Sequence, residues 1–463
     1  MLNKEVADKV IGHALSCGAD FAEIFVEDSF SSSIGLEDQK VEGASDYASK
    51  GAGIRVIYAE TTGFVHTTDI TEKGLIEAAN AARSVAKSAP NSQSRVVDLS
   101  GIRIHGQSET VDLGYFKQRA VQELTLMDDV ARSVDSSIVQ VTTSMGISGR
   151  HFVLANSNGR FIDQSTLRSR VAIKSVAKGD TGLQSGYEPV AYTVGFEEFL
   201  DMIDFEELAK NTSKRATVKL AAVPAPSGTL PVVIQKGSGG ILFHEACGHG
   251  LEADHIKKNT SVYTGRLGQV VASSLVTLVD DGTVSKQWGT YGFDDEGEEG
   301  RYNVLIRDGM LEDYMWDSNS AKTFNRESSG NGRRQSYRHL PMVRMTNTYL
   351  LPGESDPDDI VAQTERGVYV ARLTGGQVNT ATGDFVFGTQ EAYLIENGKI
   401  TSPLRDTQLI GNGPEILANI DMVGSDFDMT AGSCGKNGQS VPVGTGQPTL
   451  RISAMTLGGT ADV

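Results

Sequence analysis

The amino-acid sequence predicts an α+β protein in which N-terminal α/β units, made of helices and a mixed sheet, precede a β-rich C-terminal domain. Three observations lead to this class. Helical and strand periodicities alternate twice before residue 221, which indicates two units of mixed structure. Beyond a proline-rich boundary at 221–228, short strands and glycine-rich loops dominate. A chain of 463 residues also exceeds one ordinary hydrophobic core, so two or three domains are expected.

The first predicted domain covers residues 1–112. Apolar residues recur at helical spacing over 3–17 and again over 71–87, where Thr71 is placed to cap the helix. Alternating or β-branched runs between these helices predict strands at 21–27, 32–36, 53–58 and 62–68. Residues 90–113 hold few apolar clusters, which indicates a linker or an extended crossing segment.

The second predicted domain covers residues 113–222 and repeats the order of helix, strands and helix. Its helices are expected over 114–134 and 196–215. Strands are expected at 138–144, 151–156 and 167–177, and residues 156–159 (Asn-Ser-Asn-Gly) are typical of a hairpin turn. Residues 223–463 then form the β-rich C-terminal domain, which carries one helix near its entrance.

Composition and charge exclude several classes of protein. Hydrophobic residues make up 39% of the chain and glycines number 51, which is typical of a globular, turn-rich protein. The formal net charge of −17 argues against a nucleic-acid partner, because phosphate binding needs a basic surface. No apolar run approaches the roughly 20 residues that cross a bilayer, and the charged N-terminus lacks the apolar core of a secretory signal. We therefore expect no membrane partner.

The three cysteines, Cys17, Cys247 and Cys434, are too few and too widely spaced for a disulfide framework. A reducing compartment, the cytoplasm, is the expected location.

The stretch with the densest chemistry is His244-Glu-Ala-Cys-Gly-His249. Its nearest physical template is His-Glu-x-x-His on a helix, where both histidines bind zinc and the glutamate activates water. Here the second histidine comes one residue later, so in a regular helix the imidazoles would point about 140° apart. Glycines at 248 and 250 weaken a regular helix, and a π bulge absorbs one residue. We therefore expect a bulge or an early helix end between Cys247 and Gly250.

Residues 237–240 (Gly-Ser-Gly-Gly) come just before this helix and could cradle a phosphate. They lack the spacing and the lysine of a P-loop. We interpret them as a tight entry that lets the helix pack against its strand.

A catalytic zinc takes three protein ligands and leaves a fourth position open, so His244 and His249 need a third partner. Cys247 lies between the histidines and would strain the loop, whereas Glu252 is suitably spaced along the helix. The candidates for the third position are Cys247, Glu252, Asp254, His255, His339 and Cys434.

Glu245 directly follows a ligand, so it is expected to project beside the metal. We interpret it as the catalytic general base, which takes a proton from the metal-bound water and passes it to the leaving amine. The alternative is a helix N-terminal charge that the helix dipole favours.

Charged clusters occur elsewhere in the chain. The acidic loops 294–299 and 354–359 are expected to be solvated turns. A basic and aromatic cluster is either a solvated face or a group that binds a peptide carboxylate or an oxyanion; its members are Arg333, Arg334, Tyr337, Arg338, His339 and Arg344.

The stretch from His244 to Glu252 resembles the His-Glu-x-x-x-His signature of the TldD/PmbA family, in particular its TldD branch. The stretches at 291–297, 331–348 and 431–436 resemble that branch as well, and the similarity runs over essentially the whole chain. The resemblance implies a cytoplasmic metallopeptidase that binds one Zn²⁺ through His244, His249 and a distant cysteine, Cys434. It also implies a homodimer, or a heterodimer with a TldE/PmbA-like subunit.

The motif and the resemblance together predict zinc-dependent hydrolysis of unfolded or short peptides, and the resemblance implies precursor processing or degradation of small proteins as the setting. An extended peptide is expected to bind as an added strand in the β-rich domain. Two alternatives stay open, namely a non-catalytic modulator that binds another protein and a small-molecule hydrolase that uses the same zinc.

Overall fold

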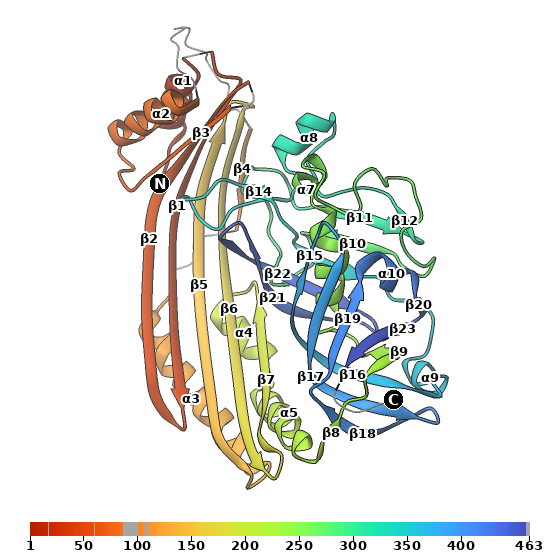
Figure 1. Cartoon of the computed structure of the whole chain (residues 1–463). Helices are drawn as coiled ribbons and strands as arrows, with labels where there is room; N and C mark the ends of the chain where they lie inside the picture. The colour runs from red at the N-terminus through yellow and green to blue at the C-terminus, as the bar shows by residue number, and fades with distance from the viewer. Residues whose placement is uncertain (17, 60, 87–100, 107–110, 460–463) are drawn as a thin grey trace.

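The computed structural model describes residues 1–16, 18–59, 61–86, 101–106 and 111–459. Figure 1 shows a long curved sheet, built before residue 193, that stands beside a β-rich C-terminal half. The predicted α+β class is confirmed.

Twelve helices and strands and a final 3-10 turn precede residue 222 in the described part of the chain. In order they are α1 (Lys4–Leu15), β1 (Phe21–Glu37), β2 (Lys40–Tyr58), β3 (Thr61–Thr67), α2 (Glu72–Ala86), β4 (Gly101–His105), α3 (Leu113–Ser133), β5 (Ile138–Asn156), β6 (Arg160–Gly179), β7 (Gly182–Tyr192), α4 (Phe196–Met202), α5 (Phe205–Val218) and the turn Lys219–Ala221.

Some predicted elements differ in extent from the observed ones. The runs at 21–27 and 32–36 belong to one long strand, β1. The helix expected over 196–215 is two helices, because Ile203 is extended and the Asp204 side chain caps α5. The predicted linker contains β4, which pairs in parallel with β6; its residues 90–100 and 107–110 lie outside the described ones.

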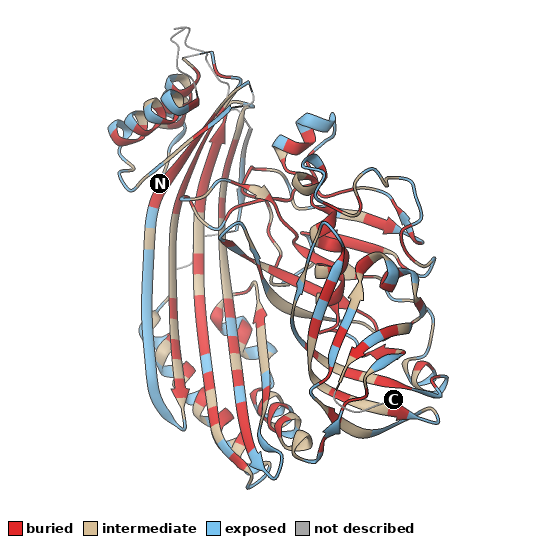
Figure 2. Cartoon of the chain, in the orientation of Figure 1, coloured by how far each residue is buried: buried red, intermediate tan, exposed pale blue. Residues whose placement is uncertain are grey.

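The long sheet has seven strands in the order β3-β2-β1-β5-β6-β4, with β7 also paired to β6. Side chains of a strand alternate between the two faces of a sheet. Ile24 of β1 packs with α1 and α2, and Ile34 further along packs with α3. Phe25 points to the opposite face, where it packs against Phe293 of the C-terminal half. The helices thus cover one face and the C-terminal half covers part of the other, and buried residues recur along the strands of the sheet (Figure 2).

The two predicted N-terminal domains share this sheet, since β1 pairs with β5 from Glu23 to Glu37. The domain boundaries at 112 and 222 stay a prediction.

The C-terminal half contains two large sheets. Its elements are β8 (Val223–Pro224), β9 (Gly228–Ile234), α6 (Gly240–Phe243), a π turn (His244–Gly248), a 3-10 turn (His249–Leu251), α7 (Ala253–Lys257), β10 (Leu278–Asp281), β11 (Tyr302–Arg307), β12 (Met310–Leu311), α8 (Ser318–Phe324), β13 (Gly332–Arg333), β14 (Met342–Val343), β15 (Asn347–Leu350), α9 (Pro357–Ala362), β16 (Arg366–Val378), β17 (Asp384–Glu396), β18 (Lys399–Arg405), β19 (Gln408–Asn412), α10 (Gly413–Ala418), β20 (Ile420–Val423), β21 (Asp428–Lys436), β22 (Gln439–Gln447) and β23 (Leu450–Gly458).

One sheet has six strands in the order β12-β11-β10-β15-β22-β21, which leaves β21 at its edge. The other has eight, in the order β16-β9-β23-β19-β17-β18-β8, with β20 beside β23. Helix α6 contacts β15 and β22 of the first sheet and β16 of the second. The segment that carries His244 and His249 therefore lies between the two sheets.

The acidic loop at 294–299 was expected to be solvated, and this expectation is wrong for its first three residues, since Asp294, Asp295 and Glu296 are buried. The loop lies against the long sheet, which supplies opposite charges. Arg150 pairs with Asp295 at 2.8 Å and Arg55 pairs with Glu296 at 2.8 Å. Buried charges persist where they are paired, and these partners come from residues distant in the sequence.

Cys247 and Cys434 are free thiols, and Cys17 lies outside the described residues. Among the helices that the structure describes, none combines the length and the apolar character needed to cross a membrane.

Candidate metal centre

The two motif histidines lie on one side of a locally widened helix. Residues His244–Gly248 form a π turn, in which the backbone N–H of His249 donates to the carbonyl of His244, five residues earlier. The wider turn accommodates the additional residue and returns His249 to the side of His244, so that the ring centroids lie 4.9 Å apart. The predicted distortion is confirmed in kind, but the π turn begins at His244, three residues before the predicted position, and a 3-10 turn at His249–Leu251 ends the helix.

The glycines before the motif let the helix approach its sheet. A Cβ on Gly240 would lie 2.3 Å from the backbone nitrogen of Gly446 in β22, closer than real Cβ atoms come. The interpretation of residues 237–240 as a tight entry is thus confirmed at Gly240. Close packing on β22 sets how far the histidines stand from the neighbouring strand, β21.

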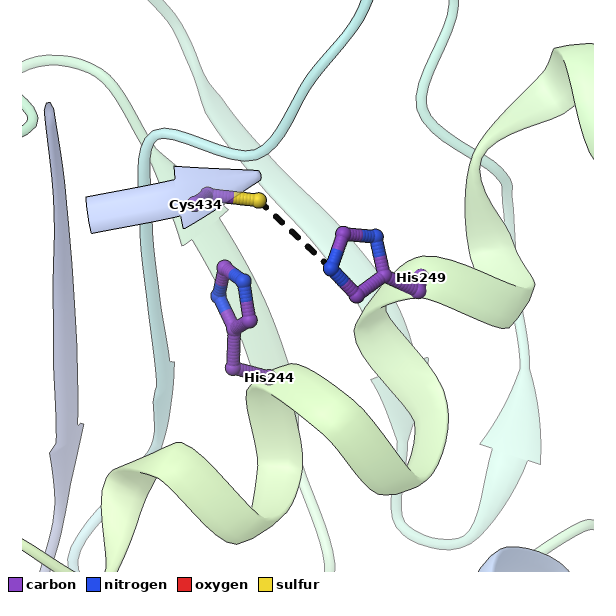
Figure 3. Close-up of side chains that lie close together, drawn as sticks. All are labelled: His244, His249 and Cys434. Atoms are coloured by element: carbon purple, nitrogen blue, oxygen red, sulfur yellow. Dashed lines mark hydrogen bonds between the residues drawn. The ribbon is translucent and has the colours of Figure 1, made fainter. Parts of the chain in front are cut away.

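Cys434 reaches the histidines from β21, the edge strand next to β22. Its Sγ lies 3.5 Å from Nε2 of His249 (Figure 3). The buried guanidinium of Arg344 donates to the backbone carbonyl of Cys434 and so fixes this part of the strand. The structure therefore brings together the three residues that the resemblance indicated, from segments 185 residues apart.

The donor set fits a zinc ion. A ring nitrogen of His244, a ring nitrogen of His249 and Sγ of Cys434 all lie within 4.8 Å of one another. Zinc–sulfur and zinc–nitrogen bonds in a tetrahedral site place sulfur and nitrogen about 3.6 Å apart, close to the 3.5 Å between Cys434 and His249. Nδ1 of His244 is buried and has no hydrogen-bond partner. A buried polar atom without a partner is costly, and a metal or an ordered water would relieve that cost.

The electrostatics favour a thiolate at Cys434. Burial alone would raise the pKa of the thiol, yet its interactions with His244 and then His249 lower the pKa of Cys434 to about 5. The thiolate is the form that binds a metal. Cys247, by contrast, has its pKa raised to about 12 by burial, and its thiol donates to the carbonyl of Phe243. Cys247 is therefore not part of the cluster.

Glu245 lies beside the cluster. Its carboxylate is 3.9 Å from Nε2 of His249, and both His244 and Glu245 line a cavity of about 260 Å³. Burial raises the pKa of Glu245, and the neighbouring histidines oppose this effect. A carboxylate with a raised pKa is a stronger base than an exposed one.

Glu252 orients His249 instead of serving as the third ligand that its spacing allowed. Its carboxylate lies 2.9 Å from Nδ1 of His249 and also accepts from Lys436 Nζ at 3.0 Å. Burial opposes ionisation, but Lys436 and then His249 lower the pKa of Glu252. A carboxylate on the second ring nitrogen orients a metal-binding histidine and makes it more basic.

Lys436 was missed by sequence reasoning. It stands two residues after Cys434 on β21, and its Nζ also lies 2.7 Å from Asp254. Glu252, Asp254 and His255 form a second group of potential ligands, but the ammonium of Lys436 already supplies a cation there. The only signal in the sequence was the two-residue separation of Cys434 and Lys436, which places both side chains on the same face of a strand.

The basic cluster has structural partners. Arg333 donates to the carbonyls of Met345 and Pro442, and Arg334 pairs with Glu23 of the long sheet. The alternative of a solvated face is therefore wrong for Arg333 and Arg334, because their guanidinium groups bind backbone carbonyls and a carboxylate from other elements. His339 bonds with Ser336 and lies outside the metal cluster.

The chain is similar to known metallopeptidases over nearly its whole length. The chain matches the models of the PmbA/TldA metallopeptidase domain 1 at residues 22–86, central domain at 113–220 and C-terminal domain at 227–459. It is 37% identical over 453 residues to a metalloprotease TldD homolog of Haemophilus influenzae, covering 95% of this chain and 93% of that one. It is 28% identical to a zinc metalloprotease TldD homolog of Saccharolobus solfataricus, covering 97% and 99%.

The fold is also similar to a solved structure, TldE from Thermococcus kodakarensis. The TM-score is 0.78 at 21% identity, and the match covers 98% of this chain and 100% of that one.

Proposed function

Because the chain belongs to the PmbA/TldD metallopeptidase family, we propose that it is a zinc-dependent peptidase that hydrolyses unfolded or short peptides. The observation that carries this proposal is the convergence of His244, His249 and Cys434 beside the carboxylate of Glu245. In this proposal His244, His249 and Cys434 hold the zinc and Glu245 is the catalytic residue.

A zinc ion in such a site acidifies water and polarises a peptide carbonyl. Glu245 accepts the proton of the attacking water and delivers it to the leaving amine. The burial that raises the pKa of Glu245 suits both steps, since the carboxylate binds the proton more tightly than an exposed glutamate does. Glu252 and Lys436 take no part in the proton transfer and hold the ring of His249 in place.

The substrate is proposed to bind in extended form along β21. Residues 430–433 of this strand line the cavity that holds His244 and Glu245. β21 pairs with β22 on one side and, among the described strands, with none on the other. A peptide that adds to this edge would bind through its backbone, which suits substrates of many sequences. A peptide complex in which the substrate is helical or leaves the β21 edge unpaired would contradict this mode.

We also propose that the protein acts in the cytoplasm as a homodimer, or as a heterodimer with a TldE/PmbA-like subunit. The similarity in fold to TldE from Thermococcus kodakarensis supports a partner subunit with the same fold as this chain. Light scattering of the purified protein, alone and with such a subunit, would distinguish these states.

The test of the proposed function compares zinc content and peptide cleavage in two variants. Glu245→Gln removes the base and keeps the size of the side chain, so zinc content should match wild type while cleavage of an unstructured peptide is lost. Glu354→Gln removes an exposed carboxylate from the loop at 354–359 and serves as the control. Full cleavage by Glu245→Gln would reject the mechanism.

The two alternative functions predict other outcomes. A wild type that binds a protein partner but cleaves nothing would favour the modulator alternative, and cleavage confined to simple esters and amides would favour the small-molecule hydrolase.

A further inference from the structure

A second cavity, of about 380 Å³, lies between the long sheet and the C-terminal half. Strands β1, β2, β5 and β6 line it from one side, and the loops near Trp288 and Arg333 line it from the other. Among the described residues, none that lines this cavity also lines the one beside His244 and Glu245. It is a separate site.

The charge of this cavity is opposite to that of the chain. Its lining includes five arginines, namely Arg150, Arg168, Arg333, Arg334 and Arg338. It includes only three carboxyl groups, namely Glu27, Asp294 and Asp295. In a protein with a formal net charge of −17, such a local excess of cations requires an explanation.

The three carboxyl groups are already engaged. Arg150 pairs with both Glu27, at 2.9 Å, and Asp295, at 2.8 Å. Asp294 accepts three backbone N–H groups, and burial, reinforced by Glu296, raises its pKa well above the usual value. None of the three forms an ion pair with Arg168 or Arg333, although the charge of Asp295 acts on both by raising their pKa values.

Arg168 and Arg333 are left without a carboxylate, although Arg333 donates to the carbonyls of Met345 and Pro442. Neither forms an ion pair with any residue in the described ranges. The guanidinium of Arg168 lies over the Trp288 ring, 5.9 Å from its centre, and makes only long contacts, of 3.4 and 3.5 Å, to carbonyl oxygens. Burial, followed by repulsion from Arg333 and Arg150, lowers the pKa of Arg168 to about 9. Nη2 of Arg150 is also buried without a hydrogen-bond partner.

Unpaired guanidinium groups that repel one another around a cavity are stable when an anion joins them. The planar guanidinium matches carboxylate and phosphate oxygens, and aromatic stacking fixes its orientation beforehand. The guanidinium of Arg168 lies over the Trp288 ring, 5.9 Å from its centre, and that of Arg333 lies 5.2 Å from the centre of the Tyr291 ring. We propose that this cavity binds an anionic group, a carboxylate or a phosphate, between Arg168 and the free donor of Arg150, with the charge of Arg333 beside it. The anion comes either from the C-terminus of a peptide or from a small free ligand.

The test measures binding by calorimetry on the zinc-loaded protein. The probes are inorganic phosphate, a short peptide with a free C-terminal carboxylate and the same peptide as its C-terminal amide. Phosphate or the peptide acid should bind, and Arg168→Gln should weaken that binding at least about tenfold, as expected for loss of a charge-assisted hydrogen bond. Arg170→Gln makes the same charge change at an exposed position of β6 and should leave binding unchanged. Binding of the peptide acid but not its amide identifies a peptide C-terminus as the source, and binding of phosphate identifies a free anion.

A second measurement separates an anion site from a structural arginine. Removal of Arg168 relieves repulsion, so Arg168→Gln should raise the melting temperature when no anion is present. Phosphate should raise the melting temperature of the wild type more than chloride at equal ionic strength. The proposal is overturned if neither anion binds or if Arg168→Gln binds as tightly as wild type. Loss of anion binding in His249→Ala with retention in Arg168→Gln would overturn it too, because the metal would then be the binding site.

Discussion

We predict that the hydrogen bond between Glu252 and His249 makes the affinity for zinc depend on a residue outside the proposed ligands. Glu252→Gln keeps the shape of the side chain and removes its charge. The bond is 2.9 Å long, and the two side chains are 0% and 12% exposed, so solvent screens it little. A charge-assisted bond of this kind contributes about 1.5–3 kcal/mol, which corresponds to a dissociation constant for zinc raised about ten- to a hundredfold.

The assay is a competition titration against a chromophoric chelator. The matched variant is Glu245→Gln, which makes the same charge change 3.9 Å from His249. It should retain affinity near wild type while it loses cleavage, whereas Glu252→Gln should retain the chemistry at saturating zinc. Wild-type zinc affinity in Glu252→Gln would refute the view that this carboxylate holds the ligand in place.

Three further predictions follow from the structure. Gly240→Ala places a Cβ against the backbone of β22, so it should lower the free energy of unfolding by about 1–3 kcal/mol and reduce zinc content. Gly435→Ala is the control, because no atom lies within 4 Å of the Cβ added beside Cys434; it should change neither quantity. Glu23→Gln removes the ion-pair partner of the buried Arg334 and should lower the free energy of unfolding in urea by about 3–5 kcal/mol. Glu312→Gln removes an exposed ion pair with Arg307 and should lower it by at most about 1 kcal/mol. Burial opposes protonation of His249, but Glu252 and then Cys434 raise its pKa well above 6.5. Protons therefore compete with zinc for this ring, and the zinc content after equilibrium dialysis should fall as the pH is lowered below that pKa.

The sequence allowed the local part of the site to be predicted because its causes are local. Glycines within the motif and a spacing of five residues between His244 and His249 indicate a distorted helix, and a π turn is present. The third member of the cluster depends on tertiary structure, since Cys434 reaches His249 only through the pairing of β21 with β22 and of β22 with β15. From the residues alone, Cys247 was disfavoured and Glu252 was suitably spaced, and only the family resemblance selected Cys434.

Charged residues were the least predictable. The charges at 294–296 suggested a solvated loop, and the arginines at 333, 334 and 344 suggested either a solvated face or a group that binds a carboxylate or an oxyanion. All six side chains are buried. Their partners are distant in sequence, as with Glu23 and Arg334, which lie 311 residues apart. A pattern of charge does not reveal its counter-charges until the long sheet and the C-terminal half are placed together. Lys436 was missed for the same reason.

X-ray absorption spectroscopy of the zinc-loaded protein tests the central claim most directly, because it reports the atoms bound to the metal. We predict one sulfur at about 2.3 Å and two imidazole nitrogens at about 2.0–2.1 Å, with the sulfur signal lost in Cys434→Ser and retained in a Cys247→Ser variant. A zinc shell without sulfur, or one unchanged in Cys434→Ser, would contradict the assignment of His244, His249 and Cys434 as the metal centre.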